Sequence, residues 1–574
     1  MIKSHALESV PRRLVRQFGR YDLAAFGLVL GGLALVALQV AVMAERVGPA
    51  GLPAIDLDPA LLPYYALRTT ARMGVALTLS LLFTFHYAPA AARDPAAERM
   101  LVPLLDVLQS VPILGYVSLL VAGLAALLPG RLLAFELAAV FALFTSQAWN
   151  LTFSFYQSLK TVPEDLAEAA TAFGLSARER FWRLEVPFAV PGLVWNAMMS
   201  VAGGWFFIVA AEAISVGGET VNLPGIGSYI AVAIASERID AILYAIGTMA
   251  IVVLSIDFLL FRPLVAWSEK FRMEIEPGEK PPRSAMLQAL SHARGSRTLA
   301  RALFRRLTSR PAEGGSGGGA PLPSSESRAR GRRLWNLAAL GGGAGAVLAL
   351  AYVTLSLPTS EWVVVATAGA ATTSRVTAMI VLAAAIWTPI GIWIGLRPRW
   401  TRAVQPIAQF FAAFPANLLY PVFVVAFVRW KLDPDIFLSP LVVLGTQWYI
   451  LFNVVAGAAA MPAELKIAAG NFQVTGILWW RKVGLPAVYP YLVTGLITAA
   501  GGAWNATVVS EVVVWGGTKL QATGLGSYIA TATDAGDFPR LVLGIGVMSA
   551  CVIAFNRALW EPLYALAVRR YRLG

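Results

Sequence analysis

The sequence predicts an all-α integral membrane protein with about twelve transmembrane helices, arranged as two parallel six-helix repeats. Three observations support this fold class. First, 57% of the 574 residues are hydrophobic and 14% are charged, whereas a soluble protein has roughly 45–50% apolar and about 25% charged residues. Second, apolar stretches long enough to cross a membrane recur along the chain. Third, the second half repeats the first at a nearly fixed offset.

The charge distribution argues against nucleic-acid binding. Of the formal net charge of +13, most lies between Lys280 and Arg333, where 12 basic residues face two acidic ones. This segment also contains a run of glycines and several prolines, which is typical of a flexible tether. Its arginines could bind anionic lipid headgroups, or they could form a solvated cytoplasmic charge run.

The sequence has few residues that could form a disulfide, bind a metal ion or bind a nucleotide. The single cysteine, Cys551, excludes an internal disulfide, and the three histidines, His5, His86 and His292, do not cluster with it. The chain has no Gly-x-x-x-x-Gly-Lys-[Ser/Thr] phosphate loop. We therefore expect no catalytic residues, no metal site and no ATP bound through that motif, which argues against a redox or zinc enzyme.

The apolar stretches define the predicted spans and units. We expect a first unit over residues 1–262, a basic tether over 263–333 and a second unit over 334–574. The stretches begin near Asp22, Met73, Leu101, Leu132, Pro191 and Ala241 in the first unit, and near Leu334, Val376, Val404, Ile436, Pro490 and Leu541 in the second.

The loop charges predict the orientation in the membrane. Lys and Arg concentrate in the amino-terminal segment, the tether, the carboxy-terminal tail and alternate short loops such as 160–183 and 481–482. The positive-inside rule places all of these, including both termini, in the cytoplasm. The rule fits least well at the loop with Arg429 and Lys431, which is predicted to lie outside and where acidic residues balance the positive charge.

The duplication appears in two registers. Arg72 matches Arg375 at an offset of 303, and from Pro163 onward the offset is 299, which relates Trp205 to Trp504 and Glu212 to Glu511. A shared register across prolines, tryptophans and glycines indicates a true repeat and not a common composition. Because each unit has an even number of spans, the two copies should have the same orientation.

The cytoplasmic segment from Thr161 to Pro187 predicts two short helices, the second of which is expected to run to Pro187. Thr161 with Glu164, and Ser176 with Glu179, have the spacing of capping boxes, and Gly174 can end the first helix in the left-handed conformation. On the first helix Ala169, Ala170 and Phe173 are expected to share a face that another protein could approach closely. An amphipathic connector lying on the membrane explains the capping and spacing equally well.

This segment resembles the EAA loop of ABC-importer permeases, which docks on the ATP-hydrolysing subunit. The motif is Glu168-Ala169-Ala170 followed by Gly174, and with Gly225-Ile226-Gly227-Ser228-Tyr229-Ile230 it is similar to the subgroup that serves nitrate, sulfonate, taurine and bicarbonate uptake. The resemblance implies the type I importer permease fold, in a bacterial inner membrane. The coupling residues it implies are Glu168, Ala169, Ala170, Phe173, Gly174, Ala468, Ala469 and Phe472.

The second copy departs from the motif. Ile467 replaces Glu168, Gln473 replaces Gly174, and Leu478 replaces Glu179, while Ala468, Ala469 and Phe472 remain. Thr475 could still cap the second helix, but no capping Thr precedes Pro462. We therefore expect a less rigid second loop.

Polar residues within the predicted spans are candidates for the translocation path. Glu212 is costly in a membrane and therefore a functional candidate, but we favour a structural carboxylate bound to backbone amides of the glycine-rich segment. The arginines could attract an anion or extend to the interface, and the Trp and Asn residues could line a path or pack. The candidates are Arg72, Arg375, Trp205, Trp504, Asn196, Asn505, Glu212 and Glu511.

The resemblance implies the permease of an ATP-driven importer for a small anion, with ATP and Mg²⁺ bound by separate ABC ATPase subunits, either two copies or a heteropair. A periplasmic or lipid-anchored solute-binding protein would deliver the solute. The alternative is a secondary transporter driven by an ion gradient, which would need intramembrane ion ligands that are scarce here. A membrane scaffold would not need the duplicated glycine-rich segment.

Overall fold

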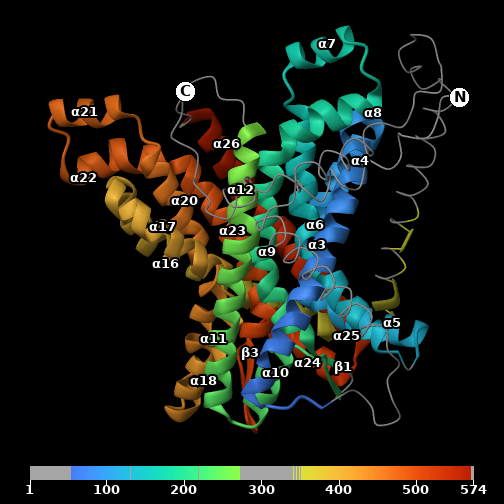
Figure 1. Ribbon diagram of the computed structural model, residues 1–574. Helices are drawn as coiled ribbons and strands as arrows, with labels where there is room; N and C mark the ends of the chain where they lie inside the picture. Colours follow the sequence, from blue (N-terminus) through green and yellow to red (C-terminus); the bar gives the residue numbers. More distant parts are fainter. Residues whose placement is uncertain are drawn as a thin grey trace, which may run out of the picture.

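The computed structural model describes residues 54–271 and 355–570, except 130 and 217–218, together with isolated positions between 341 and 353. The predicted spans that begin near Asp22 and Leu334, and nearly all of the tether, lie outside these residues. The described part is helical apart from two β-hairpins (Figure 1). This confirms the predicted all-helical architecture of the described residues, although the hairpins were not predicted.

The first half contains ten helices and one hairpin in the described residues. They are α3 (Leu62–Arg93), α4 (Pro95–Ser110), α5 (Ile113–Leu127), α6 (Leu132–Lys160), α7 (Glu164–Ala172), α8 (Ala177–Arg180), α9 (Val186–Glu212), β1 (Ala213–Val216), β2 (Glu219–Asn222), α10 (Ile226–Ala235), α11 (Ile239–Ile256) and α12 (Arg262–Ser268).

The second half repeats this order. Its elements are α16 (Thr359–Gly395), α17 (Pro398–Ala413), α18 (Tyr420–Arg429), α19 (Pro434–Phe437), α20 (Gln447–Ala459), α21 (Ala463–Asn471), α22 (Gly476–Trp479), α23 (Leu485–Ser510), β3 (Val512–Trp515), β4 (Thr518–Gln521), α24 (Leu525–Ala535), α25 (Phe538–Phe555) and α26 (Glu561–Arg570).

The described residues contain seven helices long and apolar enough to cross a membrane, and up to nine if each of two bent helix pairs counts as one span. The bent pairs cover the spans predicted near Val404 and Ile436. The span predicted near Leu101 is divided into α4 and the 15-residue α5, because Pro112 is extended at the N-cap of α5. The count of twelve stays a prediction.

Matching irregularities support the duplication. Each half has π-helical turns at corresponding places, Phe181–Glu185 with Trp480–Gly484, and Asp257–Phe261 with Asn556–Trp560. All four positions agree with the offset of 299 that the sequence shows. The helical path of the first half continues through α12 to Phe271, beyond the boundary expected at residue 262.

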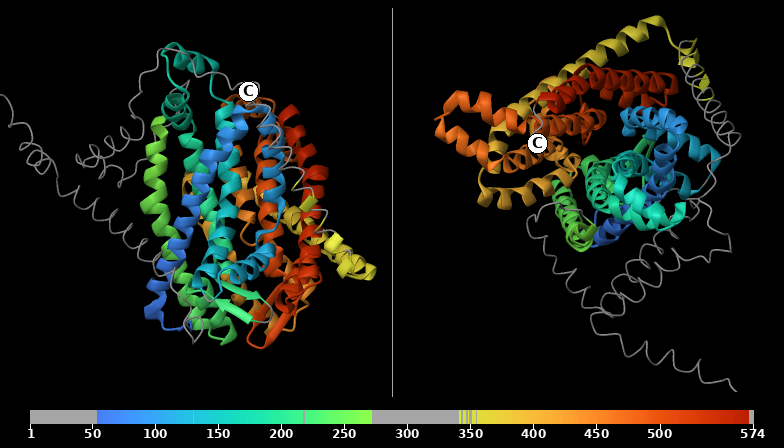
Figure 2. Two further views of the ribbon diagram at one scale, coloured as in Figure 1. Left: turned by 90° about the vertical axis from the view of Figure 1, so that its right-hand side faces the viewer. Right: turned by 90° about the horizontal axis from the view of Figure 1, so that it is seen from above.

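The two halves lie side by side with the same orientation (Figures 1 and 2). The α7–α8 and α21–α22 segments project at one end, and both hairpins lie at the other. Polar contacts join the halves. The amide of Ile113 donates to Asn505 Oδ1 over 2.8 Å, and Gly516 donates to the carbonyl of Ile234 over 3.1 Å.

Candidate coupling loops and translocation path

The first projecting loop begins at Pro163 and not at Thr161. Pro163 is the N-cap of α7 and makes no side-chain cap hydrogen bond. The Thr161 hydroxyl instead donates to the carbonyl of Gln157 over 3.0 Å. The predicted capping box of Thr161 with Glu164 is therefore wrong, because Thr161 completes the end of α6. Glu164 and Asp165 do lie in the first turn of α7, where negative charge is favourable.

The turn between α7 and α8 has the predicted geometry. Gly174 has φ of +66°, and the amide of Leu175 donates to the carbonyl of Ala170 over 3.0 Å, which ends α7. At the start of α8, Ser176 and Glu179 form the reciprocal capping box. The glycine and the second capping box are thus confirmed as local stabilising features.

The helix after this turn does not end at Pro187. It continues through the π turn Phe181–Glu185 into α9 and forms one long apolar helix over residues 177–212. The amide of Val186 donates to the carbonyl of Phe181 across the π turn. Pro187 follows at the start of α9, where its missing amide proton costs little. The loop is therefore joined directly to a membrane-spanning helix.

The second loop lacks the caps of the first. Thr475 is the N-cap of α22 but makes no side-chain hydrogen bond, so the predicted cap is wrong. Gln473 replaces the glycine and still adopts φ of +49°, a conformation that costs about 1–2 kcal/mol for an L-residue. Gly476 has φ of +59°. The second loop keeps the shape of the first with less favourable local geometry.

In both projecting loops, the division between exposed and buried residues differs from the prediction. Phe173 and Phe472 are 83% and 82% exposed, whereas Ala170 and Ala469 are 5% and 8% exposed and pack against the rest of the loop. Ala170 and Phe173 therefore do not share a face. Phe173 and Phe472 point outward, and the buried alanines let the helix sit close to the segment beneath it.

Different interactions stabilise the inner faces of the two loops. In the first half, Glu185 accepts hydrogen bonds from Arg93 over 2.6 Å and from Arg180 over 3.1 Å. The corresponding residues of the second half are Leu396, Trp479 and Gly484. Leu396 and Trp479 pack into an apolar cluster with Ala469, and a Cβ atom at Gly484 would overlap the Trp479 ring. Ion pairs have thus been exchanged for apolar packing.

At the opposite end of the first half, four buried charges form a balanced cluster. Arg72 donates to Glu136 over 2.6 Å and to Glu212 over 2.6 Å, and Arg68 donates to Glu136 over 2.8 Å. The Glu212 carboxylate also accepts from the backbone amide of Gly227 over 2.7 Å. A side chain at Gly225 would overlap this carboxylate. The cluster joins α3, α6, α9 and α10.

The second half has the equivalent cluster with one arginine. Arg375 donates to Glu511 over 2.5 Å and to Asp435 over 3.1 Å. Glu511 accepts from the amide of Gly526 over 2.7 Å. The Glu511 side chain is 1% exposed, but that of Asp435 is 51% exposed. Sequence reasoning missed Glu136 and Asp435, although the offset of 299 relates them.

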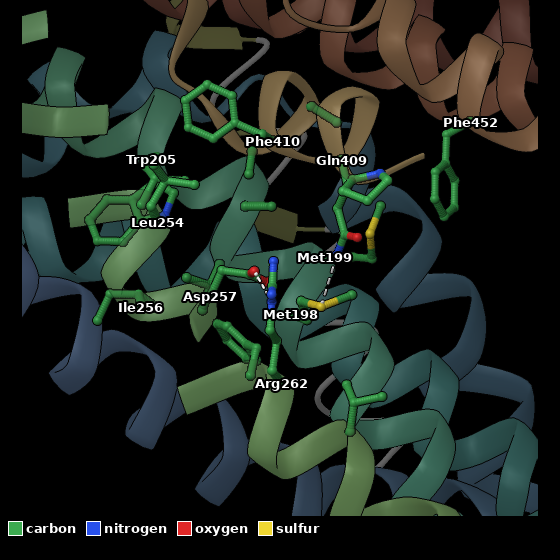
Figure 3. A pocket seen from close by; sticks show the side chains of 18 of the residues that line it. Met198, Met199, Trp205, Leu254, Ile256, Asp257, Arg262, Gln409, Phe410 and Phe452 are labelled. Carbon is green, nitrogen blue, oxygen red and sulfur yellow. Dashed lines mark hydrogen bonds and ion pairs between the residues drawn. The ribbon is translucent and has the colours of Figure 1, made fainter. Parts of the chain in front are cut away.

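A cavity of about 410 Å³ lies between the halves. It is lined by α9, α11, the π turn Asp257–Phe261 and α12 of the first half, and by α17 and α20 of the second (Figure 3). Trp205 lines it, and Trp195 stacks on Phe452 across it with ring centroids 6.1 Å apart. Asp257 and Arg262, which form an ion pair over 2.9 Å, are its charged lining residues among those described.

The other seven path candidates line neither this cavity nor a smaller one of about 70 Å³ beside it. Arg72, Arg375, Glu212 and Glu511 occupy the two charge clusters. Trp504 is 2% exposed and packs on Phe555. Asn196 donates to Ser154 over 2.9 Å, and Asn505 bonds Ile113 of the other half. The cavity residues that sequence reasoning missed include Gln409 and Phe410, which become visible only when the halves pack.

Comparison with known proteins shows that both halves of the chain match one protein family. Residues 87–270 and 387–572 each match the family described as "Binding-protein-dependent transport system inner membrane component". The chain is 29% identical over 176 residues to the nitrate import permease protein NrtB of Leptolyngbya laminosa, a match covering 31% of this chain and 60% of that protein.

Two further relatives are similar at the same level. The bicarbonate transport system permease protein CmpB of Synechococcus elongatus is 27% identical over 33% of this chain and 64% of its own length. The taurine transport system permease protein TauC of Escherichia coli is 26% identical over 38% of this chain and 74% of its own length. The chain thus spans less than two thirds of the nitrate and bicarbonate relatives.

Proposed function

Because the chain belongs to the family of binding-protein-dependent transport system inner membrane components, we propose that its two halves together form the solute path of an ATP-driven importer. The chain is a multi-pass inner membrane protein and a transport subunit, not an enzyme. The observation that carries the proposal is the pair of projecting loops, each with an exposed phenylalanine and each continuous with a long apolar helix.

In this proposal, ABC ATPase subunits that bind ATP and Mg²⁺ dock on the loops from the cytoplasm, where both termini also lie. Because α8 and α22 run unbroken into α9 and α23, a displacement of the loop tilts a helix that lines the interface between the halves. A periplasmic or lipid-anchored solute-binding protein delivers the solute at the opposite end. Alternate tilting then exposes the cavity to one side at a time.

The proposed solute is a small anion such as nitrate, a sulfonate such as taurine, or bicarbonate. The names of the nitrate and bicarbonate relatives support this class. Trp205 is the path candidate that we retain, because it lines the cavity between the halves. Arg262, which also lines the cavity, supplies a guanidinium next to Asp257. Competition among these three solutes for uptake would resolve which one is carried.

Co-purification tests the coupling part of the proposal. The tagged chain should retain ATPase subunits from native membranes, and the double substitution Phe173→Asp with Phe472→Asp should release them. Both side chains are exposed, so the substitutions change the docking face and not the fold. Phe173→Leu with Phe472→Leu is the matched control and should retain the subunits. Absence of any ATPase from the unmodified chain would refute the proposal.

A further inference from the structure

The two coupling loops present chemically different surfaces at matched positions. Residues 161–184, which leave out the buried Glu185, contain four acidic and three basic side chains, a formal charge of −1, whereas residues 460–483 contain one acidic and three basic, a formal charge of +2. The backbone paths correspond, with α7 and α8 matching α21 and α22. The partner-facing surfaces therefore differ in sign of charge although they share a shape.

Exposed apolar groups add to the difference. Ile467 and Ile477, which are 62% and 78% exposed, occupy the positions of the exposed charged residues Glu168 and Arg178. Exposed isoleucines on a projecting loop are costly unless a partner covers them. The second loop is thus suited to an apolar recess, whereas the first is suited to a polar, basic one.

We propose that the two loops dock two different ATPase subunits, one with a basic groove for the first loop and one with an apolar, acid-rimmed groove for the second. The proposal rests on the proposed function. Two identical subunits would present two identical grooves, and one of these would face a loop of the wrong charge and polarity. The exchange of the Arg93, Arg180 and Glu185 contacts for apolar packing beneath the second loop shows that the two loops differ on both faces.

Site-directed cross-linking tests the proposal in the full chain. In a Cys551→Ser background, Phe173→Cys and Phe472→Cys are introduced separately, the tagged chain is purified from native membranes, and a short thiol-to-amine cross-linker is applied. Peptide mapping by mass spectrometry then identifies the attached polypeptide. We expect a different phosphate-loop protein at each position. The same polypeptide attached at both positions would overturn the proposal.

A pair of surface exchanges separates docking chemistry from folding. Ile467→Glu with Ile477→Arg gives the second loop the exposed residues of the first, and should reduce the cross-link at position 472 about tenfold or more while the cross-link at position 173 is unchanged. Glu168→Ile with Arg178→Ile is the reciprocal change. Equal retention of both cross-links in both variants would also overturn the proposal. If no ATPase accompanies the unmodified chain, the proposed function fails instead.

Discussion

Replacing Arg72 by methionine should destabilise the first half more than replacing Arg375 destabilises the second. Arg72 is fully buried and makes two ion pairs, with Glu136 and Glu212, whose side chains are 2% and 0% exposed. Its removal leaves two buried carboxylates with Arg68 as the remaining cation of the cluster. Breaking a buried pair by removing one partner costs about 3–5 kcal/mol.

By the same reasoning, Arg375 contributes less to the stability of the second half than Arg72 does to that of the first. One of its partners, Asp435, has a side chain that is 51% exposed, so water and salt already screen that charge and the pair contributes about 1 kcal/mol at most. Only Glu511 is left buried without a cation when Arg375 is lost. We expect Arg375→Met to cost less than Arg72→Met, although both should be clearly destabilising.

Thermal unfolding of the purified proteins in detergent measures this difference. The melting temperature should fall most for Arg72→Met and less for Arg375→Met, and Glu212→Gln added to Arg72→Met should recover part of the loss because one buried charge is removed. Equal falls for the two arginine variants, or no recovery in the double variant, would refute the account of the buried clusters.

Three further predictions concern local contacts. Glu185→Gln should weaken both contacts beneath the first loop, and cross-linked ATPase at position 173 should fall while that at position 472 is unchanged. Gly227→Ala should destabilise by about 1–3 kcal/mol, because its Cβ would overlap a carbonyl of α9. Gly74→Ala, inside α3 and with open space around it, should leave the melting temperature unchanged or raise it. The hydrogen bond from Lys160 lowers the pKa of Glu98. At neutral pH the unmodified protein should therefore melt at a higher temperature than the Glu98→Gln variant, and this difference should disappear as the pH falls through the lowered pKa.

The sequence was sufficient for the features that depend on local chemistry or on the repeat. Gly174 and the Ser176 capping box follow from residue types three or four positions apart, and seven of the predicted spans follow from long apolar stretches. The offset of 299 also relates the π turns of the two halves. Such signals lie within a few residues or recur at one distance, so they are visible without a structure.

The errors arose where distant residues decide the structure. The pairing of Arg72 with Glu136 joins α3 to α6, and nothing in the local sequence of either helix indicates it. The hairpins are four-residue strands that begin where α9 and α23 end, too short to show a clear alternation. The prediction of a helix end at Pro187 is wrong, because a π turn precedes the proline and no local residue pattern indicates that turn.

The central claim is that this chain transports solute in response to ATP hydrolysis on docked subunits. Uptake of labelled nitrate, taurine and bicarbonate into proteoliposomes that contain the purified complex and its solute-binding protein tests it most directly. We predict uptake of one of these solutes that requires ATP and Mg²⁺, persists when ion gradients are collapsed, and is lost in the Phe173→Asp and Phe472→Asp double variant. Uptake that follows an imposed ion gradient without ATP would contradict the claim and favour a secondary transporter.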